Sequence, residues 1–425
     1  MTAAPPKGWC PGALRPMISG DGYLVRLRIT GGMVSASAAR AIARCAQDFG
    51  NGLLDLSARA NLQMRGVTEA TLPVLVETLQ ANGLVDESPE AEAVRNVIAS
   101  PLAGLAPDAA FDIRGSVYAL EQRLVSDATL HDLPSKFGFA IDDGGGLSLS
   151  GVSADIRFLA LHDGAPRFEV RLADGDEAAV IEAAALPDVA GALARAFFEE
   201  ARQCDLPPRR MAKLVATRGA EGIWRAAGFS PARRGAPLGS SPQPLGLNSL
   251  GACNWLGLGF AFGRVSAQSL AWLADKAEHH GSGELRLTPW RAILLPGVDA
   301  SGAEKIISQA SADVIADPSD ARLAVIACSG HPSCASATTL TQQDALALAP
   351  LARSLAPSGV TLHVSGCAKG CARPAPARVT LVARDGLYDL ISAGRASDAP
   401  MLQNLDLNAC RTALRSMASP EGIHP

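Results

Sequence analysis

An internal repeat constrains the fold of this chain more than any other feature of the sequence. Residues 32–67 align without a gap with residues 263–298, at an offset of 231, and 12 of the 36 positions are identical. Each copy predicts a strand, a turn, an amphipathic helix, a glycine-bounded turn and a second strand. A weaker echo relates "LALHDG" (159–164) to "LVARDG" (381–386). The chain therefore has two similar halves, and a ligand at the seam would be within reach of both.

The segment between the two halves predicts a linker. It contains "FSPARRGAPLGSSPQPLGLNSL", which is rich in Pro, Gly and Ser and has no hydrophobic periodicity. At 425 residues the chain is also too long for one ordinary core. We place the first half at 1–225, the linker at 226–250 and the second half at 251–425.

Charge and hydropathy exclude several classes of protein. The formal net charge of −4 argues against nucleic acid as the main partner. The N-terminal "MTAAPPKGWCPG" lacks the apolar run of a signal peptide, and no later run approaches membrane-spanning length. We therefore expect a cytoplasmic protein with no nucleic-acid or membrane partner. The odd count of nine cysteines argues against a disulfide framework.

Four of the cysteines form two tight pairs, each after a predicted buried strand. Cys328 and Cys334 follow "LAVIA" as C-x5-C, and Cys367 and Cys371 follow "VTLHV" as C-x3-C, with 32 residues between the pairs. Strand ends that each deliver two thiols to one place predict a metal site. Soft thiolates bind iron–sulfur clusters or zinc, but this spacing is too wide for a zinc knuckle and matches neither common ferredoxin pattern. Zinc and four unligated buried cysteines are the less favoured alternatives.

The remaining five cysteines do not follow this pattern. Cys10 precedes a proline in a turn-rich segment, "GWCPGALRP", and we expect it to lie outside any site. Core or incidental positions are expected for Cys45, which falls on the helix of the first repeat, and for Cys204, Cys253 and Cys410.

Arginine dominates the basic residues of the chain. Of 38 Lys and Arg residues, 32 are arginine. Nucleotide-composition bias explains such a balance in many proteins. A site that holds several carboxylates also explains it, because a planar guanidinium binds a carboxylate through two hydrogen bonds. The positions of the arginines have to decide between these two interpretations.

The C-x5-C and C-x3-C pairs, carried by the second copy of a duplicated unit, resemble the nitrite and sulfite reductase superfamily. The resemblance implies an α+β fold with a pseudo-twofold duplication of a ferredoxin-like domain plus an α/β domain. It implies that Cys328, Cys334, Cys367 and Cys371 hold a [4Fe–4S] cluster, the last cysteine of which bridges to a tetrapyrrole iron in that superfamily. The implied domains are ferredoxin-like 1–85, α/β 86–225, linker 226–250, ferredoxin-like 251–315 and α/β 316–425, which would carry the cluster.

Four segments match the tetrapyrrole-binding segments of the superfamily, and a fifth lies in the second half. They are "LVRLRITGG", "SARANLQMRGV", "AVRNVIASP", "LPSKFGFAI" and "LRLTPWRAILLPG". In the fourth, the reductases carry Lys-x-Lys, whereas this chain has Lys136 and then Gly138. That loss disfavours six-electron reduction of sulfite or nitrite. The implied substrate-binding residues are Arg26, Arg28, Arg59, Asn61, Gln63, Arg65, Arg95, Asn96, Lys136 and Arg291.

The stretch "GWCPGALRPMISGDGYLVRLR", together with "LRLTPWRAILLPG", resembles the precorrin-3B synthases, a divergent family of this superfamily. The resemblance implies a monooxygenase of aerobic cobalamin biosynthesis that uses dioxygen. It would hydroxylate the tetrapyrrole precorrin-3A at C20 and close an acetate arm onto the ring as a γ-lactone. It implies a [4Fe–4S] cluster, a mononuclear non-haem iron, and NADH-derived electrons that arrive through an external electron-donor protein.

The seven histidines do not predict the two-His-one-carboxylate site that such an iron commonly uses. His279 and His280 fall at a helix end, His331 lies inside the first cysteine turn, and His363 lies on the strand before Cys367; His131 and His162 are scattered. The catalytic residues and the mononuclear iron ligands stay unassigned. The alternative functions are a sirohaem- and [4Fe–4S]-dependent sulfite or nitrite reductase, a non-catalytic iron–sulfur or tetrapyrrole-binding protein, and a zinc-stapled interaction module.

Overall fold

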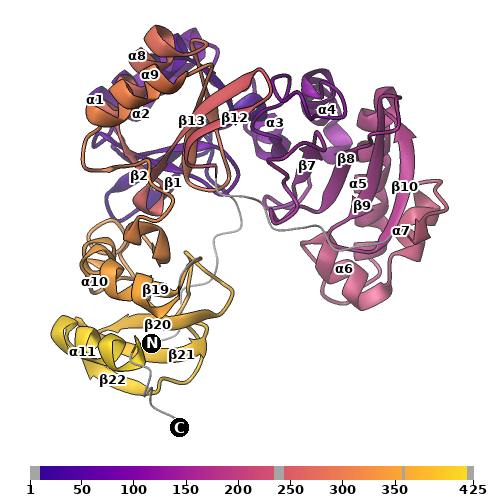
Figure 1. The fold of residues 1–425 in the computed structure, drawn as a ribbon. Helices are drawn as coiled ribbons and strands as arrows, with labels where there is room; N and C mark the ends of the chain where they lie inside the picture. The colour runs from indigo at the N-terminus through magenta and orange to yellow at the C-terminus, as the bar shows by residue number, and fades with distance from the viewer. Residues whose placement is uncertain (1–9, 234–243, 357–358, 419–425) are drawn as a thin grey trace.

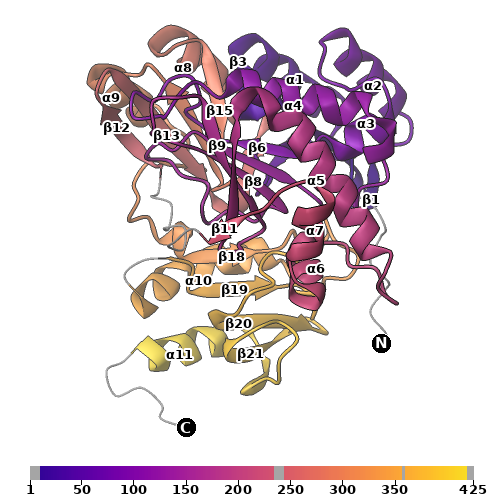
Figure 2. The same ribbon diagram turned by 90° about the vertical axis from the view of Figure 1, so that its right-hand side faces the viewer.

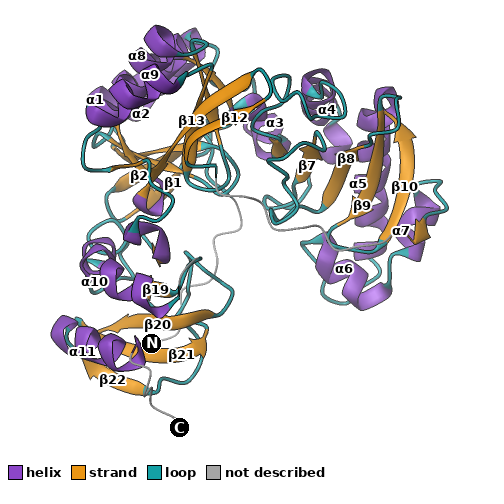
Figure 3. Cartoon of the chain, in the orientation of Figure 1, coloured by secondary structure: helices purple, strands orange, loops and turns teal. Residues whose placement is uncertain are grey.

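The computed structural model describes residues 10–233, 244–356 and 359–418. Four β-sheets, each covered by helices, make up the molecule (Figure 1), and helices and strands are interspersed along the whole chain (Figure 3). The predicted α+β fold with an internal duplication is confirmed. The middle of the predicted linker, 234–243, lies outside the described residues.

Two of the sheets belong to the two copies of the repeat. The first has the order β1 (Met17–Ser19), β2 (Gly22–Leu27), β5 (Leu62–Val67), β4 (Leu53–Leu56) and β14 (Arg264–Ser266). The second has the order β12 (Gly246–Leu250), β13 (Cys253–Phe260), β16 (Ala292–Pro296), β15 (Glu284–Leu287) and β3 (Met33–Ser35), with β17 (Val314–Ile315) paired to β13.

The two copies exchange a short strand. Strand β14 of the second copy pairs with β4 of the first, and β3 of the first copy pairs with β15 of the second. Close backbone approach makes the exchange possible at two equivalent glycines, Gly32 and Gly263, which adopt φ angles of +70° and +74°. A Cβ on Gly32 would lie 2.8 Å from the carbonyl oxygen of Leu287, and a Cβ on Gly263 would lie 2.6 Å from that of Leu56. Only glycine fits both the left-handed backbone and the space.

One hydrophobic core serves both copies. Helices α1 (Ala36–Phe49) and α8 (Ala267–His280) pack side by side on it (Figure 1). Both begin after an N-cap serine: the Oγ of Ser35 accepts from the Ala38 amide at 3.1 Å, and that of Ser266 accepts from the Ser269 amide at 2.9 Å. Apolar side chains at helical spacing on each helix are fully buried in this shared core.

The third and fourth sheets repeat one strand pattern. In each sheet the first three strands along the chain pair in parallel, and the strands that follow pair antiparallel. The "LALHDG" and "LVARDG" segments lie at the equivalent turns that follow β8 and β20. The third sheet comprises β6 (Val97–Ala99), β7 (Phe139–Asp142), β8 (Ile156–Ala160), β9 (Arg167–Leu172), β10 (Glu177–Glu182) and β11 (Ala232–Arg233). The fourth comprises β18 (Val325–Ala327), β19 (Leu362–Ser365), β20 (Ala377–Arg384), β21 (Leu387–Gly394) and β22 (Leu402–Leu405).

The other helices cover these sheets. Figure 2 shows α5 beside the third sheet, and α10 and α11 on the fourth sheet. In the described part of the chain, none of the helices combines the length and the apolar character needed to cross a membrane. These helices are α2 (Leu72–Ala81), α3 (Pro89–Val94), α4 (Arg114–Ser126), α5 (Leu186–Ala201), α6 (Met211–Arg218), α7 (Glu221–Ala226), α9 (Ala300–Ser308), α10 (Thr341–Leu355) and α11 (Leu407–Ala418).

The shared core predicts that a cavity made in one copy destabilises both. Ile42 on α1 is fully buried, so Ile42→Ala should lower the free energy of unfolding by about 3 kcal/mol. Hydrogen exchange should then show lost protection in β13 and β16 of the second copy as well as in β2 and β5. Val74→Ala, at a half-exposed position on α2, is the control. Loss confined to β2 and β5 would contradict a shared core.

Candidate functional site

The two cysteine pairs lie at one edge of the fourth sheet. Strands β18 and β19 are parallel neighbours, so their carboxyl ends meet at the same edge. Cys328 directly follows β18, and Cys367 follows β19 by two residues. Cys328, Cys334 and Cys367 are half-buried, and Cys371 is exposed. The two predicted strands therefore carry both cysteine turns to one place.

The four thiols act on one another electrostatically. Burial, and then the neighbouring Cys367, Cys328 and Cys334, raise the pKa of Cys371. The Gly366 amide donates to the Cys328 sulfur at 3.1 Å. A Cβ at Gly366 would lie 3.3 Å from that sulfur and would also overlap Ala337, so the close N–H approach depends on glycine. Amide hydrogen bonds to cysteine sulfur are a common feature of iron–sulfur sites.

A single metal ion fits this arrangement poorly. Within residues 10–233, 244–356 and 359–418, no three His, Cys, Asp or Glu side chains come together as ligands of one ion. Four thiolates on one zinc ion would lie about 3.8 Å apart, given Zn–S bonds of about 2.3 Å. A cluster of several irons and sulfides is wider, so each of its thiolates binds a different iron. Four cysteine thiolates are the ligands that such a cluster takes, so the residues present fit it by their chemistry.

Residues of the first half of the chain form hydrogen bonds with the loop that carries Cys328 and Cys334. The Ser333 carbonyl oxygen, next to Cys334, accepts from the Gly20 amide at 3.1 Å, the Ser19 hydroxyl at 2.7 Å and Arg65 Nη2 at 3.2 Å. A Cβ at Gly20 would overlap the Pro332 carbonyl oxygen, so the turn between β1 and β2 lies directly on the loop. We call this set of contacts, made by residues 19–21 and Arg65 on residues 332–334, the clamp.

Two of the predicted ligand-binding arginines are already paired with carboxylates of the chain. Arg65 is 3% exposed and lies 2.9 Å from Asp21 and 2.8 Å from Asp55. Arg95 lies 2.8 Å from Asp86 and 3.0 Å from Glu121. Burial alone would lower the pKa of both guanidinium groups, but these carboxylates outweigh it and raise the pKa.

Three other arginines lack a direct ion pair in the described part of the chain, although Glu92 acts electrostatically on Arg26 and Arg28, and Asp155 on Arg59, to raise the pKa against the effect of burial. Among the described residues, Arg26, Arg28 and Arg59 make no ion pair with a carboxylate. Arg26 donates to Gln63 Oε1 at 2.9 Å, whereas Arg28 and Arg59 donate to backbone carbonyls, Arg59 to that of Lys136. Burial, together with Arg26 for Arg28 and Arg210 for Arg59, lowers the pKa of each to about 10. A buried guanidinium without an anion is costly.

Cys10 lies beside this arginine group. Its thiol is hydrogen-bonded to Arg26 and Ser135. Burial alone would raise its pKa, but Arg26, Ser135 and Arg28 outweigh burial and lower the pKa of Cys10. The sequence around Cys10 has no periodicity and no motif. Its position beside Arg26 could therefore be recognised only from the structure.

The segment that the reductases use for a lysine pair has a different role here. A Cβ at Gly138 would overlap the Arg59 guanidinium and approach Asn96 Nδ2 at 2.8 Å. Arg59 therefore fills the space next to the backbone where a second lysine would stand. Lys136 is exposed. Asn96 donates to the Phe137 carbonyl oxygen at 2.7 Å, which ties it to this segment of the backbone.

The repeat carries arginine in both copies of one turn. In the first copy the Ser57 hydroxyl accepts from the Arg59 amide at 3.3 Å, and in the second copy the Thr288 hydroxyl accepts from the Trp290 amide at 3.2 Å. The next residue is left-handed in both: Ala60 has φ +52° and Arg291 has φ +61°. Burial, and then Arg373, lowers the pKa of Arg291 to about 10. The Asn61 side chain is used within the fold, because its Oδ1 accepts a hydrogen bond from the Ile29 amide at 3.1 Å.

The described histidines do not share a site. His131 and His162 bond the carbonyl oxygens of Val125 and Gly144, and His279 bonds that of Asp275. His363 is discussed below. A two-His-one-carboxylate group is therefore not among the described residues.

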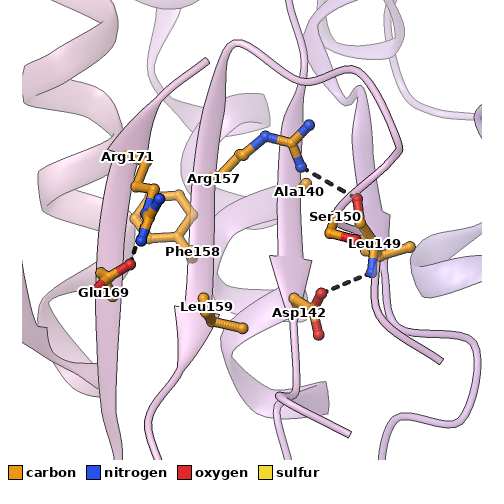
Figure 4. A pocket seen from close by; sticks show the side chains of 9 residues that line it. All are labelled: Ala140, Asp142, Leu149, Ser150, Arg157, Phe158, Leu159, Glu169 and Arg171. Carbon is orange, nitrogen blue, oxygen red and sulfur yellow. Dashed lines mark hydrogen bonds and ion pairs between the residues drawn. The ribbon is translucent and has the colours of Figure 1, made fainter. Parts of the chain in front are cut away.

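A small cavity on the third sheet is not a ligand site. It has a volume of about 20 Å³, close to that of one water molecule. Figure 4 shows its lining across β7, β8 and β9, where Arg157 donates to the Leu149 carbonyl oxygen at 3.2 Å and Asp142 accepts from the Leu149 amide at 2.7 Å. Glu169 and Arg171 pair at 2.6 Å beside them. These contacts hold the loop after β7 onto the sheet.

The position of Cys10 predicts an unusually reactive thiol. At neutral pH, iodoacetamide should modify Cys10 faster than the half-buried Cys253, because the pKa of Cys10 is lowered and burial raises that of Cys253. Arg26→Gln should slow the reaction of Cys10 and leave that of Cys253 unchanged. Timed alkylation followed by peptide mass spectrometry measures both rates. Equal rates at the two cysteines would contradict the electrostatic assignment.

Comparison with known proteins agrees with this architecture. The family model "Nitrite/Sulfite reductase ferredoxin-like half domain" matches residues 15–82 and 251–312. The solved structure of the NirA protein of Mycobacterium tuberculosis superimposes with a TM-score of 0.75 over 95% of this chain and 82% of that one. At 21% identity, that likeness establishes the fold.

Sequence relatives establish the family. A precorrin-3B synthase of Sinorhizobium sp is 33% identical over 411 residues, covering 93% of this chain and 84% of the relative. A ferredoxin–nitrite reductase of Synechococcus elongatus is 28% identical, covering 92% of this chain and 80% of the relative. The chain thus belongs to the precorrin-3B synthase family, a divergent member of the nitrite and sulfite reductase superfamily.

Proposed function

We propose that this protein is an oxidoreductase that converts precorrin-3A to precorrin-3B. The reaction would insert one oxygen atom of dioxygen at C20 and close an acetate arm as a γ-lactone, while the second oxygen atom leaves as water with two electrons from NADH. The observation that carries the proposal is the group of buried arginines that make no ion pair with any described residue, Arg26, Arg28 and Arg59, in a chain 33% identical to a named precorrin-3B synthase.

The substrate would supply the anions that these arginines lack. A precorrin carries acetate and propionate arms around its ring, and each carboxylate can accept two hydrogen bonds from one guanidinium. Arg26, Arg28 and Arg59 come from the first copy, and Arg291 comes from the equivalent turn of the second. We infer that these four bind substrate, with Gln63 orienting Arg26. Arg65 and Arg95, which are paired with carboxylates, stabilise the fold instead.

The reductase alternative is less well supported by the residues at the same place. Sulfite and nitrite reductases carry a lysine pair where this chain has Lys136 and Gly138. The Arg59 side chain occupies the space beside Gly138, and Lys136 is exposed. Arg59 would therefore contact a substrate arm at the position from which the reductases protonate their oxyanion.

The four cysteines would hold a [4Fe–4S] cluster, which supplies one-electron transfer when bound. Cys328, Cys334, Cys367 and Cys371 are the ligands in this proposal, and the Gly366 amide would hold the Cys328 sulfur in place. The clamp would hold the first cysteine loop rigid. Because relatives are named for ferredoxin, we propose an external iron–sulfur protein as the electron donor, with NADH as the ultimate reductant.

The expected mononuclear iron does not fit the described residues. They contain no group of three His, Cys, Asp or Glu side chains that would bind one ion, so we assign no ligand and no step to it.

Removing a cysteine ligand should remove the cluster. We expect Cys371→Ser to lose acid-labile sulfide, iron and the broad absorbance near 400 nm, along with conversion of precorrin-3A. Cys204→Ser, at a half-buried cysteine away from these turns, should keep all of them. Anaerobic purification with iron and sulfide analysis measures the loss, and full cluster content in Cys371→Ser would refute the assignment. Mass analysis of the product formed under isotopically labelled dioxygen tests the reaction itself.

The two kinds of arginine should respond differently to substitution. Arg28→Gln and Arg59→Gln should weaken tetrapyrrole binding about tenfold without lowering the free energy of unfolding, because each removes a buried charge that has no ion-pair partner among the described residues. Arg95→Ala should lower the free energy of unfolding by about 3 kcal/mol, because it leaves Asp86 and Glu121 unpaired. Fluorescence titration and urea unfolding measure the two effects. The reverse pattern would assign Arg95 to the ligand.

A further inference from the structure

His363 is a fully buried histidine whose hydrogen bonds are missing. It lies on β19 with 0% of its surface exposed, and neither ring nitrogen has a partner among the described residues. Leu362 and Val364, on either side, face the core beneath α10, so His363 faces the opposite side of the sheet. A Cβ on Gly370 would lie 3.7 Å from His363 Cε1, which places the ring beneath the turn between Cys367 and Cys371. Buried polar nitrogens are nearly always satisfied, so this ring points to a missing partner.

Two guanidinium groups lie within electrostatic reach of this ring. Arg291 and Arg373 both act on His363, and Arg373 also acts on Arg291. The Arg291 side chain has no hydrogen-bond or ion-pair partner among the described residues, and only its backbone carbonyl is bonded, to the Phe260 amide at 3.0 Å. Arg373 donates to the Pro376 carbonyl oxygen at 3.1 Å through Nε, which leaves its terminal nitrogens for another acceptor. Burial, then Arg373 and Arg291, lower the pKa of His363 to about 4, so the neutral ring presents one N–H donor.

The backbone at Arg291 shows how the repeat positions this side chain. A left-handed residue that is neither glycine nor asparagine is uncommon and is held by its surroundings. The repeat places Ala60 and Arg291 at equivalent positions with the same left-handed backbone, but only the second copy carries a guanidinium there. This turn directs a cation toward the half of the molecule that carries the cysteine turns, where the described residues supply no carboxylate partner for it.

We propose that His363, Arg291 and Arg373 bind one carboxylate arm of the tetrapyrrole beside the second cysteine turn. The proposal rests on the proposed function and adds a second anchoring point to it. A carboxylate accepts hydrogen bonds from two guanidinium groups and one imidazole N–H, and it supplies the negative charge that this trio lacks. Arg26, Arg28 and Arg59 would bind other arms from the first half. The two anchors would together set the position of the ring at the seam.

The test is a binding titration of the cluster-loaded protein under anaerobic conditions. The probe is uroporphyrin, a tetrapyrrole whose arms all end in carboxylates, and the signal is quenching of tryptophan fluorescence. His363→Phe and Arg291→Gln should each raise the Kd about tenfold, the factor expected for one charge-assisted hydrogen bond. Arg291→Lys should recover part of the affinity. The controls His279→Phe and Arg225→Gln, at exposed positions, should bind as the wild type does.

Two further readouts separate the possible outcomes. The methyl ester of uroporphyrin should bind the wild type and the variants equally weakly, because its arms carry no charge. If the variants bind uroporphyrin like the wild type while the midpoint potential of the cluster falls, the trio balances thiolate charge and the inference is wrong. If the wild type itself does not bind uroporphyrin, the proposed function fails as well. Should His363→Phe not fold, Arg291→Gln and His363→Gln provide the same readout.

Discussion

The exchange of strands β3 and β14 is the constraint on which the rest of the structure depends. Because each sheet takes its last strand from the other copy, neither copy completes its sheet alone, and one core serves both. The exchange also sets the two equivalent turns at Arg59 and Arg291 relative to each other, through the close approach at Gly32 and Gly263. The arginines of the two turns are therefore carried by one shared core.

The clamp connects this shared core to the cysteine loop. Asp55 on β4 pairs with Arg65 and also with Arg264 on the exchanged strand β14, at 2.8 Å in each case. Arg65 then reaches the carbonyl oxygen of Ser333 in the loop. The two carboxylates and the carbonyl satisfy the Arg65 guanidinium, whereas Arg264 Nη2 is buried without a partner among the described residues. The ion pairs of Asp55 with Arg65 and Arg264 thus connect the seam between the two copies with the first cysteine loop.

The arginines show where inference from sequence stops. The matched segments located Arg28, Arg59, Arg65 and Arg95 equally well. Their roles differ because of carboxylates that lie elsewhere in the chain, such as Asp21 for Arg65 and Glu121 for Arg95. Whether a buried guanidinium needs a ligand depends on the charge within a few ångströms of it, and that charge comes from residues distant in sequence. The nearness of Cys10 to Arg26 likewise depends on the fold.

The sequence by itself determined what depends on local pattern: the duplication, the strands that precede the cysteine pairs, the helices of the repeat and the α+β class. Hydrophobic periodicity and turn residues act over a few positions, so they can be recognised along the chain. Only the tertiary structure decided which copy contributes β3 and β14, which arginines are paired with a carboxylate, and that His363 is buried with no hydrogen-bond partner in the described part of the chain. These properties depend on distances between residues far apart in sequence, because pairing and charge compensation are set by the space between side chains.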